Sequence, residues 1–364
     1  MTASALAERV GVAASLLSHY ERKSVTPSSE VLDRLARELR VPRHHFLQPA
    51  LDRAGGSPFR FRSLAAATKR NRESVTERTR WLREICGTFE EYVDLPSADL
   101  PVFETPSDPN AISEAFIEEA AVRARRAWGM GDAPIKDVVA LLEAHGCLVA
   151  RFPFGTEDVE AVSQWQDSRP VILLNSDSAT RVRSRFDAAH ELGHLVLHRN
   201  VPPGASAIPA IHKLLEKQAH RFARAFIFPA QPFRTEIYTT SIEALVEPKR
   251  RWGLSVYEIV TRAEQLGMIS DDQAQRAYVQ MGRRWGGRKD EPLDKGWEHE
   301  RPVMMNKALE LIVGDRTLEA LLAELPYDET DIEILTGLQK GDLRERFGPE
   351  PASVGTVVPF RRRD

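Results

Sequence analysis

The chain has 364 residues, enough for two or three domains, and a formal net charge of −3, which excludes a protein drawn to nucleic acid by its overall charge. Its only two cysteines, Cys86 and Cys147, exclude a disulfide-stabilised scaffold. No apolar run is long enough to cross a bilayer, and the first residues lack the apolar core of a signal peptide. We therefore expect a cytoplasmic protein with no membrane partner.

Residues 1–49 are predicted to form a helix-turn-helix. Apolar residues recur at helical spacing over 2–9, 13–22 and 30–39, and Gly11 separates the first two segments. In such a domain the second helix enters the major groove of DNA with its N-terminal end forward. The candidates for DNA contacts are therefore Ser15, Ser18, His19 and Arg22. The segment is only mildly basic, so a small helical bundle that contacts protein remains an alternative.

Residues 50–110 are expected to connect this bundle to the next domain. A long helix is predicted over 70–93, because its apolar residues form one stripe. Four prolines follow between residues 96 and 109 and predict an irregular linker.

Residues 111–235 are predicted to form a second domain, which mixes helices and strands. The residue pattern predicts helices over 114–127 and 135–145, strands over 147–152, 159–165 and 171–175, and helices over 180–198 and 213–228. Residues 236–340 are predicted to be a helical C-terminal region, and the tail 349–364 to be disordered. The expected fold class is α+β, mainly helical, with one small sheet.

The segment from His190 to His194 reads His-Glu-Leu-Gly-His, an HExxH motif. On a helix, positions i and i+4 share a face, so both imidazoles can bind one ion, and two neutral nitrogens suit Zn²⁺. Glu191 can then take a proton from a water on the metal, because zinc lowers the pKa of that water to about 7. Chance alone gives such a motif in roughly one or two of a hundred chains of this length, so we interpret it as a metal site.

A catalytic zinc needs a third protein ligand. Glu216 is our candidate, since it lies at the edge of the buried face of the next helix, where a carboxylate without a partner is costly. A solvated charge beside Lys217 is the alternative, and the spacing alone does not decide between them. His212 and His220 are weaker candidates.

Two further histidines are candidates for supporting roles. His220 follows Glu216 by four residues and is placed to hydrogen-bond a ligand. His198 is one turn beyond His194, which suits a helix cap or contact with a ligand.

The run from Arg183 to His198, with the segment 216–229, resembles the ImmA/IrrE family of metallopeptidases. The upstream motif Leu142-Glu143-xx-Gly146 also fits this family. Two downstream motifs, Glu291-Pro292 and Glu300-x-Pro302, are similar to long family members that carry an N-terminal XRE-type helix-turn-helix. The resemblance implies a minimal thermolysin-like (zincin) domain, with a small sheet against two metal-binding helices. It also implies Glu216 as the third ligand of Zn²⁺, and cleavage of a partner regulator such as a transcriptional repressor.

The chain departs from the family pattern in two places. The family usually has Asn or Asp where this chain has His220. XRE-type domains also have a helix before the one expected at 2–9, so we expect the bundle to lack a member and to be marginal alone. A homodimer is one expected way to cover the apolar residues that this exposes.

Two functions are consistent with these features. The first is a zinc-dependent endopeptidase that regulates transcription by hydrolysing a peptide bond in a partner, with the helix-turn-helix binding DNA. The second is a DNA-binding transcription factor whose peptidase-like domain senses a ligand or metal without proteolysis. Glu191 favours the first, because a metal sensor needs no general base. For the first, we expect the substrate to bind extended along the strand at 159–165.

Overall fold

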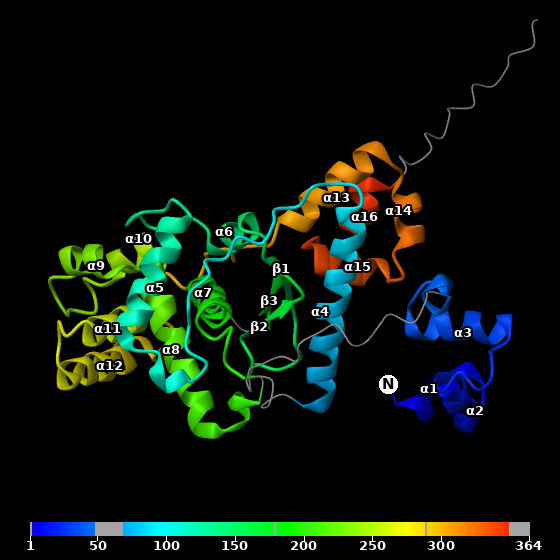
Figure 1. Cartoon of the computed structure of the whole chain (residues 1–364), viewed down its shortest axis with the longest axis horizontal. Helices are drawn as coiled ribbons and strands as arrows, with labels where there is room; N and C mark the ends of the chain where they lie inside the picture. Colours follow the sequence, from blue (N-terminus) through cyan, green and yellow to red (C-terminus); the bar gives the residue numbers. More distant parts are fainter. Residues whose placement is uncertain (1, 48–67, 178–179, 203, 288–289, 349–364) are drawn as a thin grey trace, which may run out of the picture. The chain divides into compact units, whose positions relative to one another are not determined.

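The computed structural model describes residues 2–47, 68–177, 180–202, 204–287 and 290–348 (Figure 1). The chain divides into two compact units, one of residues 1–49 with 309–334 and 338–364, the other of residues 50–308 with 335–337. The described residues are mainly helical and contain one three-stranded sheet, which confirms the expected fold class. The disorder expected for 349–364 falls outside these residues. None of the described helices is long and apolar enough to cross a membrane.

The smaller unit begins with three helices, α1 (Ala3–Val10), α2 (Ala14–Glu21) and α3 (Ser29–Leu39). Gly11 ends α1 with a φ of 71°, a left-handed conformation that glycine adopts readily, and so makes the turn into α2. The helices enclose a small core, while Leu39 is 41% exposed. The buried residues of this core are Ala7, Val10, Leu17, Val31 and Leu35.

C-terminal helices join the same unit. Two adjacent histidines of a 3-10 turn, η1 (Arg43–Phe46), form hydrogen bonds with the C-terminal segment at residues 325–326. His44 Nε2 lies 2.9 Å from the carbonyl oxygen of Leu325, and His45 Nδ1 lies 2.7 Å from that of Pro326. Residues 236–340, predicted as one helical C-terminal region, are therefore distributed over both units. The last four described helices of the chain are α13 (Met304–Asp315), α14 (Leu318–Glu324), α15 (Glu329–Thr336) and α16 (Asp342–Phe347).

The larger unit contains the sheet, with strands β1 (Leu148–Phe152), β2 (Ala161–Gln166) and β3 (Arg169–Asn175). The strand order is β1-β3-β2, with β1 parallel and β2 antiparallel to β3. Asp167, at a φ of 53°, turns β2 tightly into β3. Because β3 lies in the middle, β2 is an edge strand among the described residues.

Helix α7 (Arg181–Leu197) packs against β2 and β3 and against α8 (Pro209–Ile227) (Figure 1). Fifteen of its 17 residues are buried, which makes it the central helix of this unit. A Cβ atom at Gly193 would lie 3.1 Å from the Phe222 ring and 3.2 Å from the carbonyl oxygen of Ala219. Glycine at this position therefore lets the backbones of α7 and α8 come close together.

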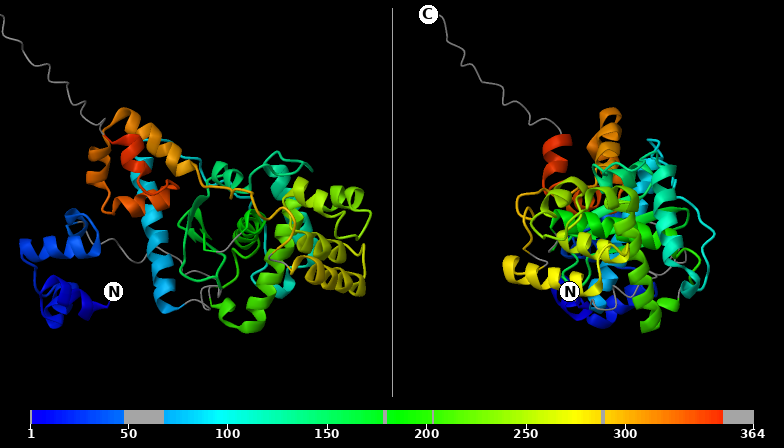
Figure 2. Two further views of the ribbon diagram at one scale, coloured as in Figure 1. Left: turned by 180° about the vertical axis from the view of Figure 1, so that it is seen from behind. Right: turned by 90° about the vertical axis from the view of Figure 1, so that its left-hand side faces the viewer.

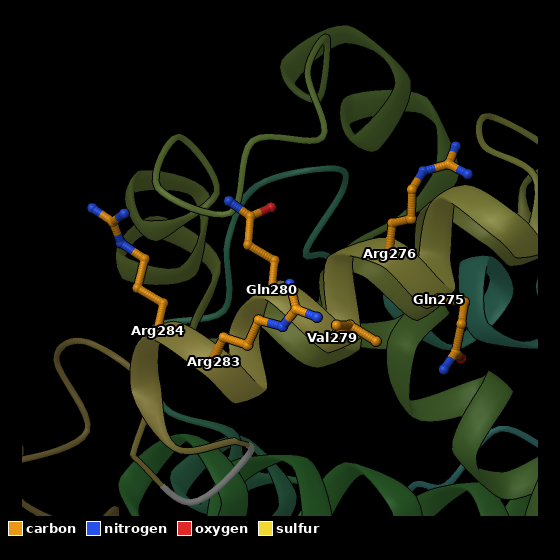
Figure 3. A pocket seen from close by; sticks show the side chains of 6 residues that line it. All are labelled: Gln275, Arg276, Val279, Gln280, Arg283 and Arg284. Carbon is orange, nitrogen blue, oxygen red and sulfur yellow. The ribbon is translucent and has the colours of Figure 1, made fainter.

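The remaining helices surround this centre. Helix α4 (Lys69–Glu90) packs one apolar face against β1, and α5 (Glu114–Ala127) packs against α8. Helices α11 (Val256–Gln265) and α12 (Asp271–Trp285) lie side by side, and α11 also contacts α8 (Figures 1 and 2). The outer face of α12 carries long polar side chains, among them Arg276 and Arg283 (Figure 3). The other short helices are α9 (Ala230–Glu236) and α10 (Val246–Trp252).

Buried glutamates join segments of this unit that are far apart in sequence. Glu143, in α6 (Val138–Ala144), accepts hydrogen bonds from the backbone N–H groups of Val303 and Met304 at the start of α13. Glu300 accepts bonds from the N–H groups of Val138 and Val139 at the start of α6. Glu300 therefore satisfies free N–H groups at the start of α6, the helix that contains Glu143. Glu143 in turn satisfies those at the start of α13, the helix that follows Glu300 in the chain.

Candidate metal centre

The HExxH motif lies in α7, and its two histidines face α8. His190 Nε2 and His194 Nε2 are 3.0 Å apart. Glu216, in α8, brings Oε2 to 3.2 Å from His190 Nε2 and Oε1 to 3.4 Å from His194 Nε2. The structure therefore brings the three expected ligands together from two helices.

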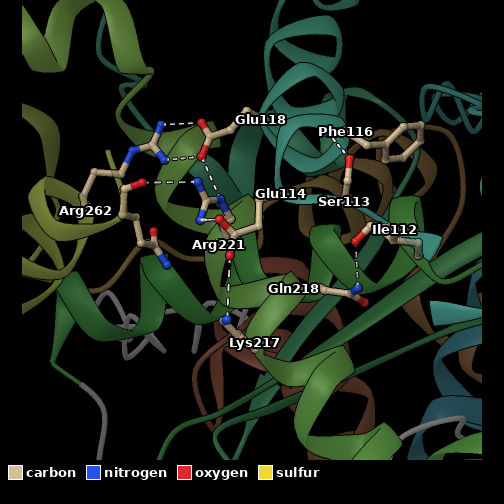
Figure 4. A network of polar contacts seen from close by, with 10 residues as sticks. Ile112, Ser113, Glu114, Phe116, Glu118, Lys217, Gln218, Arg221 and Arg262 are labelled. Atoms are coloured by element: carbon tan, nitrogen blue, oxygen red, sulfur yellow. Dashed lines mark hydrogen bonds and ion pairs between the residues drawn. The ribbon is translucent and has the colours of Figure 1, made fainter. Parts of the chain in front are cut away.

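The protonation of His194 follows from a chain of hydrogen bonds behind it. Gln218 Nε2 donates to the carbonyl oxygens of Pro109 (2.8 Å) and Ile112 (3.2 Å; Figure 4), so its Oε1 is the acceptor for His198 Nε2 at 3.1 Å. His198 therefore carries its proton on Nε2, and its Nδ1 accepts from His194 Nδ1 at 3.0 Å. Burial lowers the pKa of His198 well below its usual range, which keeps this ring neutral.

This arrangement leaves lone pairs pointing at one another. With its proton on Nδ1, His194 presents the Nε2 lone pair toward the carboxylate oxygen of Glu216, and two acceptors at 3.4 Å repel unless a cation lies between them. His190 Nε2 faces the same point. Two imidazoles and one carboxylate are a common donor set for catalytic zinc, so these residues fit that ion.

Glu191 is buried beside these ligands. Its Oε2 accepts a hydrogen bond of 2.5 Å from Ser163 Oγ on β2. Burial raises the pKa of Glu191 to about 7, against the opposing effects of His190 and of the Ser163 hydrogen bond. A carboxyl group with a pKa near neutrality can both take and give a proton. Ser163 belongs to no sequence motif, so the sequence alone does not predict its role.

His212 and His220 lie in α8 four residues before and four residues after Glu216, on the same face of the helix. His220 Nδ1 donates to the carbonyl oxygen of Glu216 at 2.7 Å, and its ring centroid lies 4.3 Å from that of His190. Ligand atoms of His190, Glu216 and His220 lie within 4.8 Å of one another. His190 Nδ1 is buried without a hydrogen-bond partner in the described structure, so His220 contacts this ring without hydrogen-bonding it. His212 Nδ1 is 3.7 Å from Glu216 Oε1.

Ion pairs join α8 to α5 (Figure 4). Glu118, in α5, binds Arg262 of α11 through two bonds of 2.6 and 2.7 Å and accepts a third from Arg221 Nε at 3.0 Å. The Arg262 side chain is fully buried and that of Glu118 is 22% exposed, so water screens this ion pair less than it screens a pair on the surface. The network fixes α8, and with it Glu216, against two other helices.

Comparison with known families finds two matches along the chain. Residues 142–264 match a peptidase family described as the IrrE N-terminal-like domain, and residues 1–46 match the helix-turn-helix family. Residues 142–264 form an IrrE N-terminal-like domain. The IrrE N-terminal-like match contains all three strands and both helices of the site, and the two matches confirm the resemblance found in the sequence. No curated protein matches the chain.

The helix-turn-helix domain precedes the IrrE N-terminal-like domain, a combination that suits a regulator of transcription. The predicted DNA contacts of this domain are Ser15, Ser18 and His19 in α2 and Arg22 at its C-cap, at spacings that share one face of a helix. Ser15, His19 and Arg22 are exposed, whereas Ser18 is half-buried. His19 Nδ1 lies 3.0 Å from Ser24 Oγ, which ties this ring to the end of the helix.

Proposed function

We propose that this protein is a zinc-dependent endopeptidase that hydrolyses a peptide bond in a partner regulator, such as a transcriptional repressor. The observation that carries the proposal is the convergence of His190, His194 and Glu216 on one point, with the Glu191 carboxylate held beside them. Zinc, when bound there, supplies an acidified water and polarises the scissile carbonyl.

The chain's own residues account for the proton transfers. Glu191 takes a proton from the attacking water and passes it to the leaving amine, and its pKa of about 7 suits both steps. Ser163 holds the carboxylate in place from β2. The hydrogen bonds from His194 through His198 to Gln218 keep the His194 ring oriented and its Nε2 free of a proton.

The substrate is proposed to bind extended along β2. This strand pairs only with β3 among the described residues, so its outer edge has backbone groups for a further strand. Ser163 connects β2 directly to Glu191, so a peptide on this edge lies next to the general base.

We propose that the helix-turn-helix binds DNA through Ser15, Ser18, His19 and Arg22. The exposed face of α2 supports this assignment. The alternative, a transcription factor whose peptidase-like domain only senses a metal or ligand, requires the same metal ligands but no general base. The buried Glu191–Ser163 hydrogen bond therefore favours hydrolysis.

A peptide-library digestion separates the two functions. Zinc-loaded protein is incubated with a mixture of peptides, and new termini are identified by mass spectrometry. Glu191→Gln is the matched control, because it keeps the shape of the side chain and removes the base. Cleavage by the wild type and none by the variant supports the endopeptidase. Equal product from both, or none from the zinc-loaded wild type, contradicts it.

A further inference from the structure

A cavity of about 370 Å³ lies beside the metal centre. Its wall includes His220 and Phe186, whose rings lie 5.6 Å apart, and His220 in turn lies against His190. A group bound in the cavity is therefore separated from the metal ligands by one imidazole ring. The volume is in the range of sites that bind small ligands or side chains.

The cavity wall is acidic. Arg183 is the one basic side chain that lines it among the described residues, against six carboxylates: Glu157, Glu160, Asp177, Asp187, Glu258 and Asp294. Three of the carboxylates have cationic partners, since Glu160 pairs with Arg183, Glu258 with Arg224 and Asp294 with Lys249. The other three form no ion pair within the described part of the chain. The cavity therefore has negative charge that its own wall does not neutralise.

Asp187 is the strongest indication that a ligand belongs there. It lies in α7 one turn before His190, it is only 6% exposed, and its Oδ2 has no hydrogen-bond partner among the residues that the structure describes. A buried acceptor without a partner costs free energy, so such groups in proteins usually have one. Burial and the neighbouring Glu160 carboxylate raise the pKa of Asp187 well above its usual value. A bound hydrogen-bond donor would satisfy Asp187 Oδ2, and a bound cation would offset the repulsion between Asp187 and Glu160.

The cavity suits a ligand larger than a metal ion. Within the described residues, the side chains close enough together to hold an ion gather around His190 and Glu216, with His194 and His220, and no cavity carboxylate is among them. The cavity carboxylates are spread over the wall and do not meet at one point. A guanidinium presents five N–H donors in one plane and can reach several separate acceptors, and an ammonium presents three.

We propose that this cavity binds the arginine or lysine side chain of the substrate peptide next to the scissile bond. The inference rests on the proposed peptidase function and adds its substrate class. Asp187 holds the cation at the buried end, while Glu157 and Asp177, both exposed, attract it at the rim. Because His220 lines the cavity and also lies against His190, the bound residue lies next to the metal centre.

The test is a titration with two matched peptides. Ac-Ala-Ala-Arg-Ala-Ala-NH2 and its citrulline counterpart, which has the same shape without the charge, are titrated into zinc-loaded Glu191→Gln protein, which does not consume them. We expect the arginine peptide to bind roughly tenfold or more tightly, the effect of one good charge-assisted contact. Asp187→Asn should remove most of this preference. Glu157→Gln, at the exposed rim, should reduce it without disturbing the core, and Glu247→Gln, an exposed acid outside the cavity, should leave it unchanged.

Zinc content is measured in the same samples, so that the two proposals can fail separately. Equal binding of the two peptides by zinc-loaded protein, or no measurable binding of either at millimolar concentration, overturns the basic-residue cavity and leaves the peptidase standing. An arginine preference in protein that holds no zinc supports the cavity and removes the peptidase.

Discussion

Ser163 Oγ donates a hydrogen bond of 2.5 Å to Glu191 Oε2 and thereby joins the edge strand β2 to the helix of the HExxH motif. A buried carboxylate that loses its donor is free to turn away from the metal centre. Ser163→Ala should therefore lower the cleavage rate roughly 10- to 100-fold, the range for one hydrogen bond to a charged group. Zinc content should not change, since Ser163 contacts no ligand. A rate equal to the wild type would show that Ser163 does not position the base.

The hydrogen bonds behind His194 should control metal affinity. Gln218→Leu keeps the size of the side chain but removes the acceptor for His198, so the His194 ring loses its fixed tautomer. We expect zinc affinity to fall roughly 10- to 100-fold, the usual effect of removing the group that orients a ligand. Competition with a chelator measures this, and Gln275→Leu, on the exposed face of α12, is the control (Figure 3).

Gly146 should be essential for stability. Its φ is +79°, and a Cβ there would lie 2.3 Å from the carbonyl oxygen of Ser97 and 2.6 Å from the backbone nitrogen of Ala98. Gly146→Ala combines a left-handed alanine with a backbone clash and should cost about 2–4 kcal/mol of unfolding free energy. Gly131→Ala is the matched control, because its φ is +54° and nothing lies within 4 Å of the new Cβ. It should cost about 1–2 kcal/mol. Denaturant unfolding compares the two, and equal losses would contradict the role of the clash.

The stability of the larger unit should depend on pH through Glu143. Burial raises the pKa of Glu143 to about 7, against the opposing hydrogen bonds from Val303 and Met304. The folded protein therefore holds this proton at pH values where the unfolded chain, with a pKa near 4.5, has lost it. Stability contributed by this group is fully present below pH 4.5 and is lost as the pH rises toward 7. Unfolding at pH 5 and pH 8 should show a larger drop for the wild type than for Glu143→Gln, and identical drops would exclude Glu143 as the cause.

The sequence predicted the elements of the site better than their contacts. The three strands and the two metal helices lie within a few residues of their predicted bounds, because apolar periodicity and capping are local signals. The pairing of His190 with His194 is also local. Glu216 comes from a separate helix, and only the close packing at Gly193 brings it to the motif, so spacing alone left its role open.

Other functional contacts had no signal in the sequence. Ser163 and Gln218 reach the site from a strand and from the face of α8 next to Glu216, and nothing in the residues around them marks their partners. Glu143 and Glu300 were visible only as parts of motifs shared with a family. The structure gives a physical reason for them, since each binds the N-terminus of a helix more than 150 residues away.

The central claim is a zinc ion held by His190, His194 and Glu216, and elemental analysis of purified protein tests it most directly. The wild type and Glu191→Gln should each contain about one zinc per chain, because the base is not a ligand. His190→Ala and Glu216→Ala should contain far less, since each removes one of three ligands. Full zinc content in His190→Ala or Glu216→Ala, or a wild type that takes up no zinc, would contradict this account.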